Sequence, residues 1–254
     1  MFSGILKMKK VFAACALALS AFCVSAQADT LKVGSHPTFA PFEFVDSEGK
    51  AIGFDIDLIN AIAKANGDTV EIVSMPFDGL IPALVTNQID AIISGMTITD
   101  ARKERVEFTD GYYKSIQSVL IRKADAEKFK KVEDLKGQKI CTQIGTTGDK
   151  FARTLSEDVI AMNNEPDALM ELRNGGCAAL INDRPTNLYY LLQSKATEIG
   201  ELKDDSLYLN PEFYGIAVNK NNKALVKRLN AGLEKIAASG ELKSIHEKWF
   251  GVAD

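Results

Sequence analysis

Residues 80–95 read LIPALVTNQIDAIISG, and residues 168–183 read ALMELRNGGCAALIND. The two stretches share leucine, alanine and isoleucine at three matched positions, and Gly95 aligns with Asp183. Each begins with apolar residues at helical spacing and ends in a short apolar run, which is typical of a helix leading into a buried strand. We interpret the pair as a weak internal repeat, which predicts one such helix–strand unit in each of two lobes.

The rest of the chain continues this alternation of β-rich runs and amphipathic helical segments. Strands are predicted over residues 31–35, 69–75, 89–95, 159–163 and 177–183, and helices over residues 53–67, 78–88, 151–157, 166–176 and 224–251. A short helix followed by a strand is predicted over residues 132–145. This order is that of βαβ units, and it predicts an α/β fold whose open sheets are mostly parallel.

Two extended runs that are poor in turn residues, 112–123 and 213–220, each follow one of these blocks. They predict that the chain crosses into the second lobe once and returns once, so that the two crossings form a hinge. The expected boundaries are 29–115 and 213–254 for lobe 1 and 116–212 for lobe 2. Because ligands of open α/β sheets bind beyond the carboxyl ends of the strands, Gly95 and Asp183 are expected to line the cleft between the lobes.

The first 28 residues have the charged-then-apolar pattern of a secretory signal peptide, with cleavage expected after Ala28. The pattern fits best if Met8 is the true start. Loss of the three leader lysines takes the net charge from −4 to −7. Because Phe22 is not the small residue that a lipoprotein signal places before its cysteine, here Cys23, we favour a soluble exported protein over a lipid-anchored one.

The composition excludes several classes of function. The 254-residue chain is 46% hydrophobic and 25% charged, which is ordinary for a globular protein. No basic excess suggests a nucleic-acid partner, and no long apolar run apart from the leader suggests a membrane protein. The mature chain keeps Cys141 and Cys177, which either form a disulfide in an oxidising compartment or are small buried residues with free thiols.

Common catalytic and metal-binding motifs are absent from the sequence. There is no His-Glu-x-x-His, no Gly-x-Ser-x-Gly and no phosphate-binding Gly-x-x-x-x-Gly-Lys, and the two histidines, His36 and His246, belong to no cluster with metal-ligand spacing. We therefore predict neither a cofactor nor a metal.

Arg102 is the first of three cations near the start of a predicted helix. Thr99 is a good N-cap residue for that helix. Cations are disfavoured at the positive end of a helix by a few tenths to about 1 kcal/mol each, so the position favours a bound anion. The alternative is that Arg102 is solvated or pairs with Glu104 or Glu107.

Two further features suggest how such an anion site is completed. The Gly145–Gly148 turn precedes a helix and offers backbone N–H groups, and Asp183 offers a negative charge from the other lobe. A fixed positive and a fixed negative charge across a cleft suit a small zwitterion, whose carboxylate an arginine can hold with two hydrogen bonds. The alternative for Asp183 is a helix N-cap, because Pro185 follows early in the next helix.

A set of motifs, in order from about residue 31 to residue 251, resembles the bacterial extracellular solute-binding proteins of family 3, the polar amino-acid family that feeds ABC importers. These motifs are GFDIDLINAIAK, DGLIPAL, IDAIISGMTITDARKERVEFTDGYY, DLKGQKI, IGTT, IND and KWFG. The resemblance implies a two-lobed periplasmic binding protein fold of type II. It also implies a monomer that binds an L-amino acid noncovalently, closes over it at the hinge and presents it to a permease in the inner membrane.

The resemblance also implies roles for individual residues. Arg102 matches the arginine that clamps the ligand α-carboxylate, and Thr147 matches a position whose backbone N–H joins it. The carbonyl of Gly95 and the carboxylate of Asp183 match the groups that contact the ligand α-ammonium, and the hydroxyl of Thr97 matches one that contacts the ligand backbone. Phe39 and Phe77 match aromatic positions against the ligand side chain, although ordinary core packing is the alternative for both.

Three positions bear on ligand identity: His36, Gln143 and Asn182. None of them is a fixed charge at neutral pH, although His36 can be protonated. They favour an uncharged polar side chain such as that of glutamine. A basic amino acid such as arginine is the alternative ligand, and it would need an acid from elsewhere, for example Glu43.

Two other functions remain as alternatives. A cyclohexadienyl-dehydratase-like enzyme on the same fold would need a general acid in the cleft, for which Asp183 or His36 would have to serve. A ligand-sensing module of a larger receptor is expected to need a separate partner, because the sequence ends at Asp254, just after KWFG. The full set of amino-acid-binding positions favours the binding protein over both.

Overall fold

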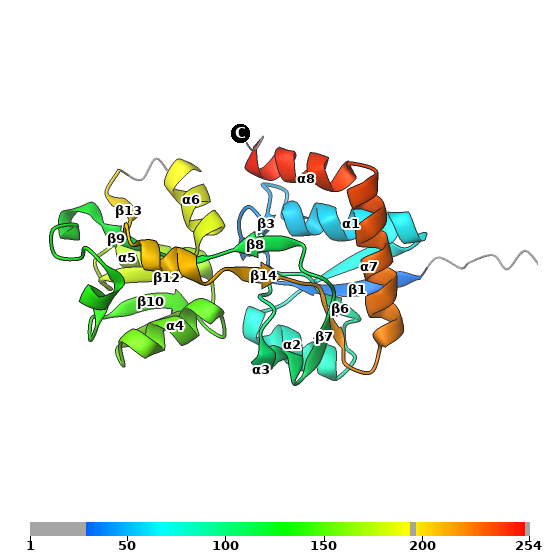
Figure 1. Ribbon diagram of the computed structural model, residues 1–254, viewed down its shortest axis with the longest axis horizontal. Helices are drawn as coiled ribbons and strands as arrows, with labels where there is room; N and C mark the ends of the chain where they lie inside the picture. Colours follow the sequence, from blue (N-terminus) through cyan, green and yellow to red (C-terminus); the bar gives the residue numbers. More distant parts are fainter. Residues whose placement is uncertain (1–28, 194–196, 252–254) are drawn as a thin grey trace, which may run out of the picture.

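The computed structural model describes residues 29–193 and 197–251, which form two lobes side by side (Figure 1). The predicted leader and its cleavage site after Ala28 lie outside the described residues. Each lobe has one five-stranded sheet with helices on both faces. Among the described residues, none of the helices combines the length and the apolar character needed to cross a membrane.

The sheet of lobe 1 has the strand order β5-β1-β6-β15-β7. In that order its strands are Thr69–Ser74, Thr30–Ser35, Ala91–Ile92, Ala217–Asn219 and Val106–Phe108. The sheet of lobe 2 has the order β11-β10-β12-β9-β13. Its strands are Val159–Met162, Ile140–Gln143, Ala179–Asp183, Gln117–Arg122 and Ile199–Glu201. A smaller sheet in lobe 1 joins β2 (Thr38–Phe39), β3 (Glu43–Val45) and β4 (Ala51–Ile52).

Both sheets are mixed, with the same arrangement of directions. The first three strands are parallel, and the fourth, β15 or β9, is antiparallel to both neighbours. The expectation of mostly parallel sheets therefore misses one reversed strand in each lobe. That reversed strand is the one that follows a crossing between the lobes, so each sheet is completed by chain arriving from the other lobe.

Most of the helices lie where the sequence predicts them, with some different ends. They are α1 (Phe54–Asn66), α2 (Phe77–Val85), α3 (Asp100–Lys103), α4 (Thr147–Leu155), α5 (Glu165–Arg173), α6 (Arg184–Gln193), α7 (Lys223–Ala238) and α8 (Glu241–Phe250), with 3₁₀ turns at Lys123–Asp125, Val132–Leu135 and Asp205–Leu209. The single helix predicted over 224–251 is two helices. Gly240 takes φ 82° between them, a left-handed conformation that ends α7 and lets the chain turn into α8.

The internal repeat predicted from the sequence corresponds to equivalent structure in the two lobes. In one lobe α2 leads into β6, and in the other α5 leads into β12. Between helix and strand, Asn87 (φ 57°) and Gly175 (φ 84°) occupy matched positions and share the left-handed conformation. The turn geometry therefore repeats although the residue does not, since asparagine is one of the few residues besides glycine that adopt it readily.

The two crossings run next to each other between the lobes (Figure 1). They pair as antiparallel strands β8 (Tyr113–Ser115) and β14 (Glu212–Tyr214). The predicted lobe boundaries, after residues 115 and 212, fall at or inside these strands, and we keep them as a proposal. Tyr214 is fully buried at this point, so the hinge is continuous with the core of lobe 1.

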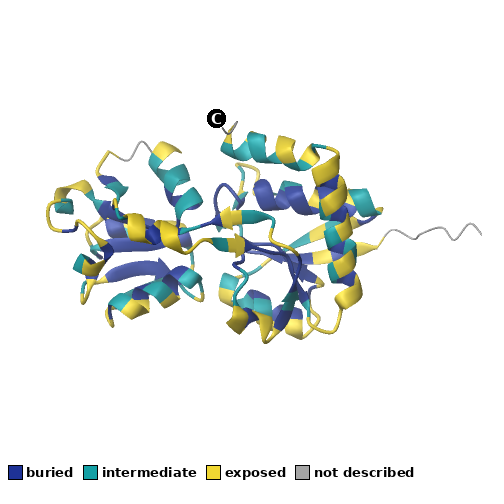
Figure 2. Ribbon diagram, viewed as in Figure 1, coloured by how far each residue is buried: buried dark blue, intermediate teal, exposed yellow. Residues whose placement is uncertain are grey.

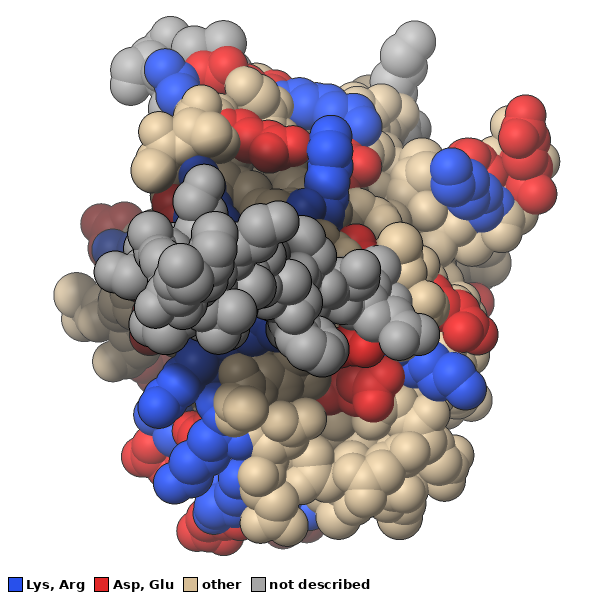
Figure 3. Space-filling view, turned by 90° about the vertical axis from the view of Figure 1, so that its right-hand side faces the viewer, with Lys and Arg blue, Asp and Glu red and all other residues tan. Residues whose placement is uncertain are grey.

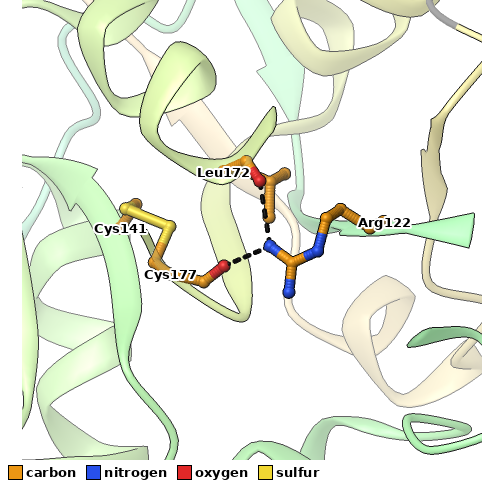
Figure 4. The surroundings of a disulfide bond; sticks show 4 residues. All are labelled: Arg122, Cys141, Leu172 and Cys177. Carbon is orange, nitrogen blue, oxygen red and sulfur yellow. Dashed lines mark hydrogen bonds between the residues drawn. A yellow bond between two sulfur atoms is a disulfide. The ribbon is translucent and has the colours of Figure 1, made fainter. Parts of the chain in front are cut away.

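Each sheet has a hydrophobic cluster on both of its faces (Figure 2). In lobe 1, α1 and α7 cover one face and α2 covers the other. In lobe 2 the sulfur atoms of Cys141 and Cys177 are bonded inside the cluster between α5 and the sheet. Arg122 donates hydrogen bonds to the carbonyls of Leu172 and Cys177, which fixes the turn that carries the second cysteine (Figure 4).

The outer surface of lobe 1 carries charges of both signs. On the face seen in Figure 3, basic and acidic side chains are interspersed rather than gathered into one large patch of a single sign. This visible distribution agrees with the near-balanced composition of 30 basic and 34 acidic residues.

Candidate functional site

A cavity between the lobes is lined by all ten residues predicted to contact a ligand. It encloses about 370 Å³ outside the protein atoms, including the part open to solvent. The predicted residues in its lining are His36, Phe39, Phe77, Gly95, Thr97, Arg102, Gln143, Thr147, Asn182 and Asp183. Glu43, Ser94, Thr146 and Gly148 complete the lining.

The fold brings these residues together at the carboxyl ends of strands. His36 follows β1, and the loop from Ser94 to Thr97 follows β6. Gln143 and Asp183 end β10 and β12 in the other lobe. Both sheets therefore present the edge at which open α/β sheets bind ligands, and the two edges face each other.

Arg102 is buried in the cavity wall with only 7% of its surface exposed. Its Nη1 donates to the carbonyl of Thr97 at 2.7 Å, and its Nη2 donates to the carbonyl of Gly145 in the other lobe at 3.2 Å. The guanidinium carbon also lies 5.4 Å from the centre of the Phe77 ring. Burial lowers the pKa of Arg102, while the nearby Asp183 and Glu212 act in the opposite direction. Arg102 is therefore an interior cation, and the alternative of a solvated surface charge does not hold.

The helix that carries Arg102 is shorter than predicted. Thr99 caps it as expected, because its hydroxyl accepts from the amide of Arg102 at 3.2 Å. However, α3 is a single turn of four residues, and Arg105 lies beyond it. A helix this short has no separate positive end, so the helix-dipole reason for an anion at Arg102 fails, and burial is the property that makes the cation unusual.

Asp183 faces the same cavity from the end of β12. One of its oxygens accepts from Gln117 Nε2 and the other from the Tyr214 hydroxyl. Burial and the neighbouring Glu212 raise the pKa of Asp183 to about 7, against the hydrogen bonds from Tyr214 and Gln117 and the charge of Arg102. Because both oxygens are engaged by side chains of the hinge region, the helix N-cap alternative does not describe this residue.

The turn before α4 presents the backbone amides that the sequence predicts. The hydroxyl of Thr146 accepts from the amide of Asp149 at 3.0 Å and caps the helix, which begins at Thr147. A Cβ at Gly148 would lie 3.1 Å from the carbonyl of Ile181, so a side chain there would crowd the neighbouring strand β12. The amides of this first turn therefore lie beside the cavity, at the positive end of a nine-residue helix.

Gly95 lies under the ring of Phe39 in a conformation that favours glycine. Its φ is 50°, and a Cβ at this position would lie 2.8 Å from the Phe39 ring. Its amide donates to Oδ2 of Asp55 at 2.7 Å. Phe39 belongs to the core cluster of lobe 1 and also lines the cavity, so core packing and cavity lining are not alternatives here.

Both ring nitrogens of His36 in lobe 1 are hydrogen-bonded to residues of lobe 2. Its Nδ1 accepts from Gln143 Nε2 at 2.9 Å, and its Nε2 lies 3.2 Å from Oδ1 of Asn164. Since Oδ1 only accepts, the ring proton belongs on Nε2. Burial lowers the pKa of His36, against the hydrogen bond to Asn164 and the charge of Asp78. The histidine is therefore not a cation at neutral pH.

Glu43 and Asp55 form a buried acid pair beside the loop from Ser94 to Gly95. Glu43 Oε1 accepts from the Ser94 hydroxyl at 2.8 Å, and Asp55 Oδ2 accepts from Tyr112 at 2.8 Å as well as from Gly95. Burial raises the pKa of Glu43 well above its usual range, with Asp55 adding to the effect, and burial raises the pKa of Asp55 to about 6. The two carboxyl groups are hydrogen-bonded to each other, so they share a proton.

Several residues of this site were not singled out from the sequence. Glu212, in the second crossing, accepts hydrogen bonds from residues of both lobes. Gln117 and Tyr214 hold Asp183, and Asn164 holds His36. Gln117 and Tyr214 lie inside the two predicted extended runs, whereas Glu212 and Asn164 lie outside them. Within the described residues, no group of three or more His, Cys, Asp and Glu side chains is arranged to hold a metal ion.

Comparison with known proteins agrees with this geometry. Residues 31–252 match the family described as bacterial extracellular solute-binding proteins, family 3. A probable histidine-binding protein of Neisseria gonorrhoeae is 37% identical over 96% of this chain and 97% of its own length. The ABC transporter arginine-binding protein 1 of Escherichia coli K12 is 33% identical over 96% of this chain and 99% of its own.

A solved structure matches at the level of the fold. An ancestral arginine-binding protein bound to glutamine superposes with a TM-score of 0.81 at 39% identity, covering 88% of this chain and 98% of that one. The two mixed sheets therefore form the type II periplasmic binding protein fold. These relatives are binding proteins for amino acids rather than enzymes, which argues against the dehydratase alternative. The chain belongs to the bacterial extracellular solute-binding proteins, family 3, and is an amino-acid-binding protein of the ABC transporter type.

Proposed function

We propose that this protein captures a polar L-amino acid between its lobes in the periplasm and delivers it to an ABC importer in the inner membrane. The observation that carries the proposal is the placement of Arg102 and Asp183, which are buried, opposite in charge and on the walls of one cavity. Within the described residues, neither side chain forms a salt bridge. An α-carboxylate and an α-ammonium are the groups that would complete both charges at once.

Binding by this route uses contacts from both lobes. Arg102 and the amides of Thr147 and Gly148 offer donors to the α-carboxylate, while Asp183 and the carbonyl of Gly95 offer acceptors to the α-ammonium. Because these groups come from two lobes joined only through the hinge region, the ligand binds tightly only when the lobes approach each other. Closure would then create the paired lobe surface that a permease recognises.

Two sets of residues bear on the ligand side chain. The uncharged lining of His36, Gln143 and Asn182 supports a glutamine-like ligand, as expected from the sequence. Glu43 supports a basic one, because its carboxyl group lines the same cavity and is paired with a second buried acid, Asp55. The Glu43–Asp55 pair keeps a negative charge when it shares one proton, and within the described residues no lysine or arginine forms a salt bridge with it.

We therefore propose a basic L-amino acid such as arginine as the preferred ligand and glutamine as the alternative. A guanidinium has five N–H donors and a charge, which suits an acid pair better than a carboxamide does. The names of the related proteins, which specify arginine or histidine, support this order. The related structure with glutamine bound supports keeping glutamine as the second candidate.

A ligand screen tests both the proposed class of ligand, an amino acid, and the proposed preference for arginine over glutamine. Residues 29–254 would be stripped of bound ligand by unfolding and refolding, and then melted with each standard amino acid, ornithine, citrulline, cystine and prephenate. A ligand at 100 times its dissociation constant stabilises by about 2.7 kcal/mol, enough for a shift of several degrees. The largest shift with arginine supports the proposal, and the largest shift with glutamine supports the alternative. A response to prephenate alone would contradict both and point to the enzyme.

The role of Glu43 has its own test. Glu43→Gln should weaken arginine binding by about 10-fold or more, because it removes the acid from a buried ion pair, and should change glutamine binding much less. Glu48→Gln, which changes an exposed glutamate of lobe 1, is the matched control. Equal losses for the two ligands would mean that Glu43 supports the site without selecting the side chain.

A further inference from the structure

Glu212 is hydrogen-bonded to residues on both walls of the ligand site. Its Oε2 accepts hydrogen bonds from the hydroxyl of Thr97 at 3.1 Å, the hydroxyl of Thr147 at 2.9 Å and Nε2 of Gln117 at 3.2 Å. Thr97 belongs to lobe 1, Thr147 begins helix α4 of lobe 2, and Gln117 lies just beyond the first crossing. A single carboxylate oxygen in the second crossing therefore touches both walls of the cavity.

The same hydrogen-bond network reaches Asp183, which faces the proposed ligand ammonium. Gln117 Nε2 donates to Asp183 as well as to Glu212, and it also lies 3.0 Å from the hydroxyl of Thr147. Glu212 itself sits in β14, paired through its backbone with Ser115 of β8. The second crossing thus holds Glu212 directly against the cavity wall, and Gln117 links Glu212 to Asp183.

The chemistry of a carboxylate restricts how the two hydroxyl groups can point. A carboxylate only accepts hydrogen bonds, so the hydroxyl of Thr97 must give its single proton to Glu212. The Thr97 oxygen then presents only its two lone pairs to the cavity, and these can accept hydrogen bonds. An ammonium group donates three hydrogen bonds, and the acceptors that face it are Asp183, the carbonyl of Gly95 and this oxygen of Thr97.

We propose that Glu212 is a positioning residue that turns the Thr97 hydroxyl into an acceptor for the ligand α-ammonium. This inference rests on the proposed function, in which the ligand is an amino acid. It adds that Glu212 decides whether the Thr97 hydroxyl donates or accepts a hydrogen bond in the ligand site. Glu212 does not touch the ligand and acts through Thr97. A neutral glutamine at the same position would allow the hydroxyl to accept from the amide and to point its proton into the cavity, where it would oppose the ammonium.

The test compares an amino acid with its des-amino analogue. Glu212→Gln keeps the size of the side chain, and calorimetry would measure the binding of arginine and of guanidinovaleric acid, its des-amino analogue. We expect the affinity for arginine to fall by about 10-fold or more, as for loss of a hydrogen bond to a charged group, while the affinity for the analogue changes by less than about threefold. Glu234→Gln, which changes an exposed glutamate on α7, should leave both affinities within about twofold.

A double-mutant cycle distinguishes positioning from a general structural role. If Glu212 acts through Thr97, then Thr97→Val removes the same interaction, and the double variant binds arginine about as well as the weaker single variant. Equal losses for arginine and its analogue, or losses that multiply in the double variant, would overturn the proposal and leave Glu212 as a contact between the lobes. If Glu212→Gln does not fold, Thr97→Val is measured alone, and it must lower the affinity for arginine more than the affinity for the des-amino analogue.

The wild-type control separates this inference from the proposed function. If the wild-type protein binds neither arginine nor glutamine, the proposed function fails before Glu212 is considered. If the wild type binds an amino acid and the variant shows no discrimination, only the inference about Glu212 fails. For a wild type that prefers glutamine, the same comparison is made with glutamine and its des-amino analogue.

Discussion

Gln143 and His36 lie 107 residues apart in the sequence and on opposite lobes, and Nε2 of the first donates a 2.9 Å hydrogen bond to Nδ1 of the second. The other ring nitrogen of His36 meets Asn164, which is also in lobe 2. These contacts exist only while the lobes are together. They therefore stabilise the closed arrangement of the two lobes independently of Arg102 and Asp183, which we propose hold the ligand backbone.

Removal of this contact should speed ligand release. Gln143→Ala loses the buried hydrogen bond to His36 between the lobes and a second one to the carbonyl of Asn163 within lobe 2. Only the first depends on closure and is worth about 1 kcal/mol, so we expect the dissociation rate constant to rise by about fivefold and the association rate constant to change little. Stopped-flow fluorescence or surface plasmon resonance measures both constants. Gln193→Ala, which changes an exposed glutamine at the end of α6 in lobe 2, is the control. An unchanged dissociation rate would show that the His36 contact contributes nothing to closure.

Asp183 should recognise the ligand ammonium in particular. Asp183→Asn removes the charge while keeping a side chain of similar shape beside Gln117 and Tyr214. We expect the affinity for the amino acid to fall by about 30-fold or more, and that for its des-amino analogue to fall far less. Calorimetry with both ligands measures the difference. Losses of equal size would indicate that Asp183 supports the lobe structure and does not contact the ammonium.

The pH should affect ligand affinity through Asp183. Burial raises the pKa of Asp183 to about 7 in the empty site, whereas a bound ammonium favours the ionised carboxylate. Ligand binding therefore requires proton loss below that pH, and the affinity should rise by about 10-fold between pH 6 and pH 8 and flatten above pH 8. Calorimetry across this range tests the expectation, and Asp183→Asn should flatten the profile. A rise of the same size in the variant would assign the proton to another group.

The stability of the empty protein should change with pH in the opposite sense. Burial raises the folded-state pKa of Asp55 to about 6, of Asp183 to about 7 and of Glu165 to about 8. The stabilisation from a raised carboxyl pKa is complete below the unfolded value and is lost as the pH rises through the folded value, here from about 4 to 8. His36, whose pKa is lowered, acts against this trend below about pH 6.5. Melting without ligand should therefore give a higher midpoint at pH 5.5 than at pH 8, and a lower one would contradict these shifts.

The bond between Cys141 and Cys177 should stabilise lobe 2. It closes a loop with a sequence separation of 36, for which the chain-entropy account gives about 4 kcal/mol. The double variant Cys141→Ser, Cys177→Ser should unfold at a lower temperature but keep its affinity at 25 °C, because neither sulfur lines the cavity. Thiol titration of the denatured, unreduced protein should find no free thiol in the mature chain, and two free thiols would rule the bond out.

Much of the fold follows from local patterns in the sequence. Apolar spacing predicted α1 and its end at Gly67, and the repeat predicted that α2 with β6 would correspond to α5 with β12. The strand that completes each sheet could not be predicted this way, because β9 and β15 reach their sheets across the hinge. Their position depends on pairing with strands distant in the sequence, which periodicity does not report.

The candidate site was predicted less evenly. The resemblance to a known family identified ten of the fourteen residues that line the cavity, whereas the helix-dipole explanation of Arg102 was wrong because α3 is only one turn. Glu212, Gln117 and Asp55 were missed, since an acid or an amide in a short strand or helix looks like a solvent-facing residue until the packing around it is known. Only the three-dimensional structure reveals that these side chains point inward and hold the residues that face the cavity.

The role of Arg102 is tested most directly by calorimetric titration of ligand-stripped wild type, Arg102→Ala and Arg105→Ala with the amino acid that gives the largest thermal shift. Arg105 is exposed and three residues away, so its variant controls for loss of a positive charge in this region. We predict that Arg102→Ala weakens binding by about 100-fold or more while Arg105→Ala binds like wild type, with all three proteins folded by circular dichroism. Affinity for Arg102→Ala within a few-fold of wild type would contradict the claim that this buried guanidinium holds the ligand carboxylate.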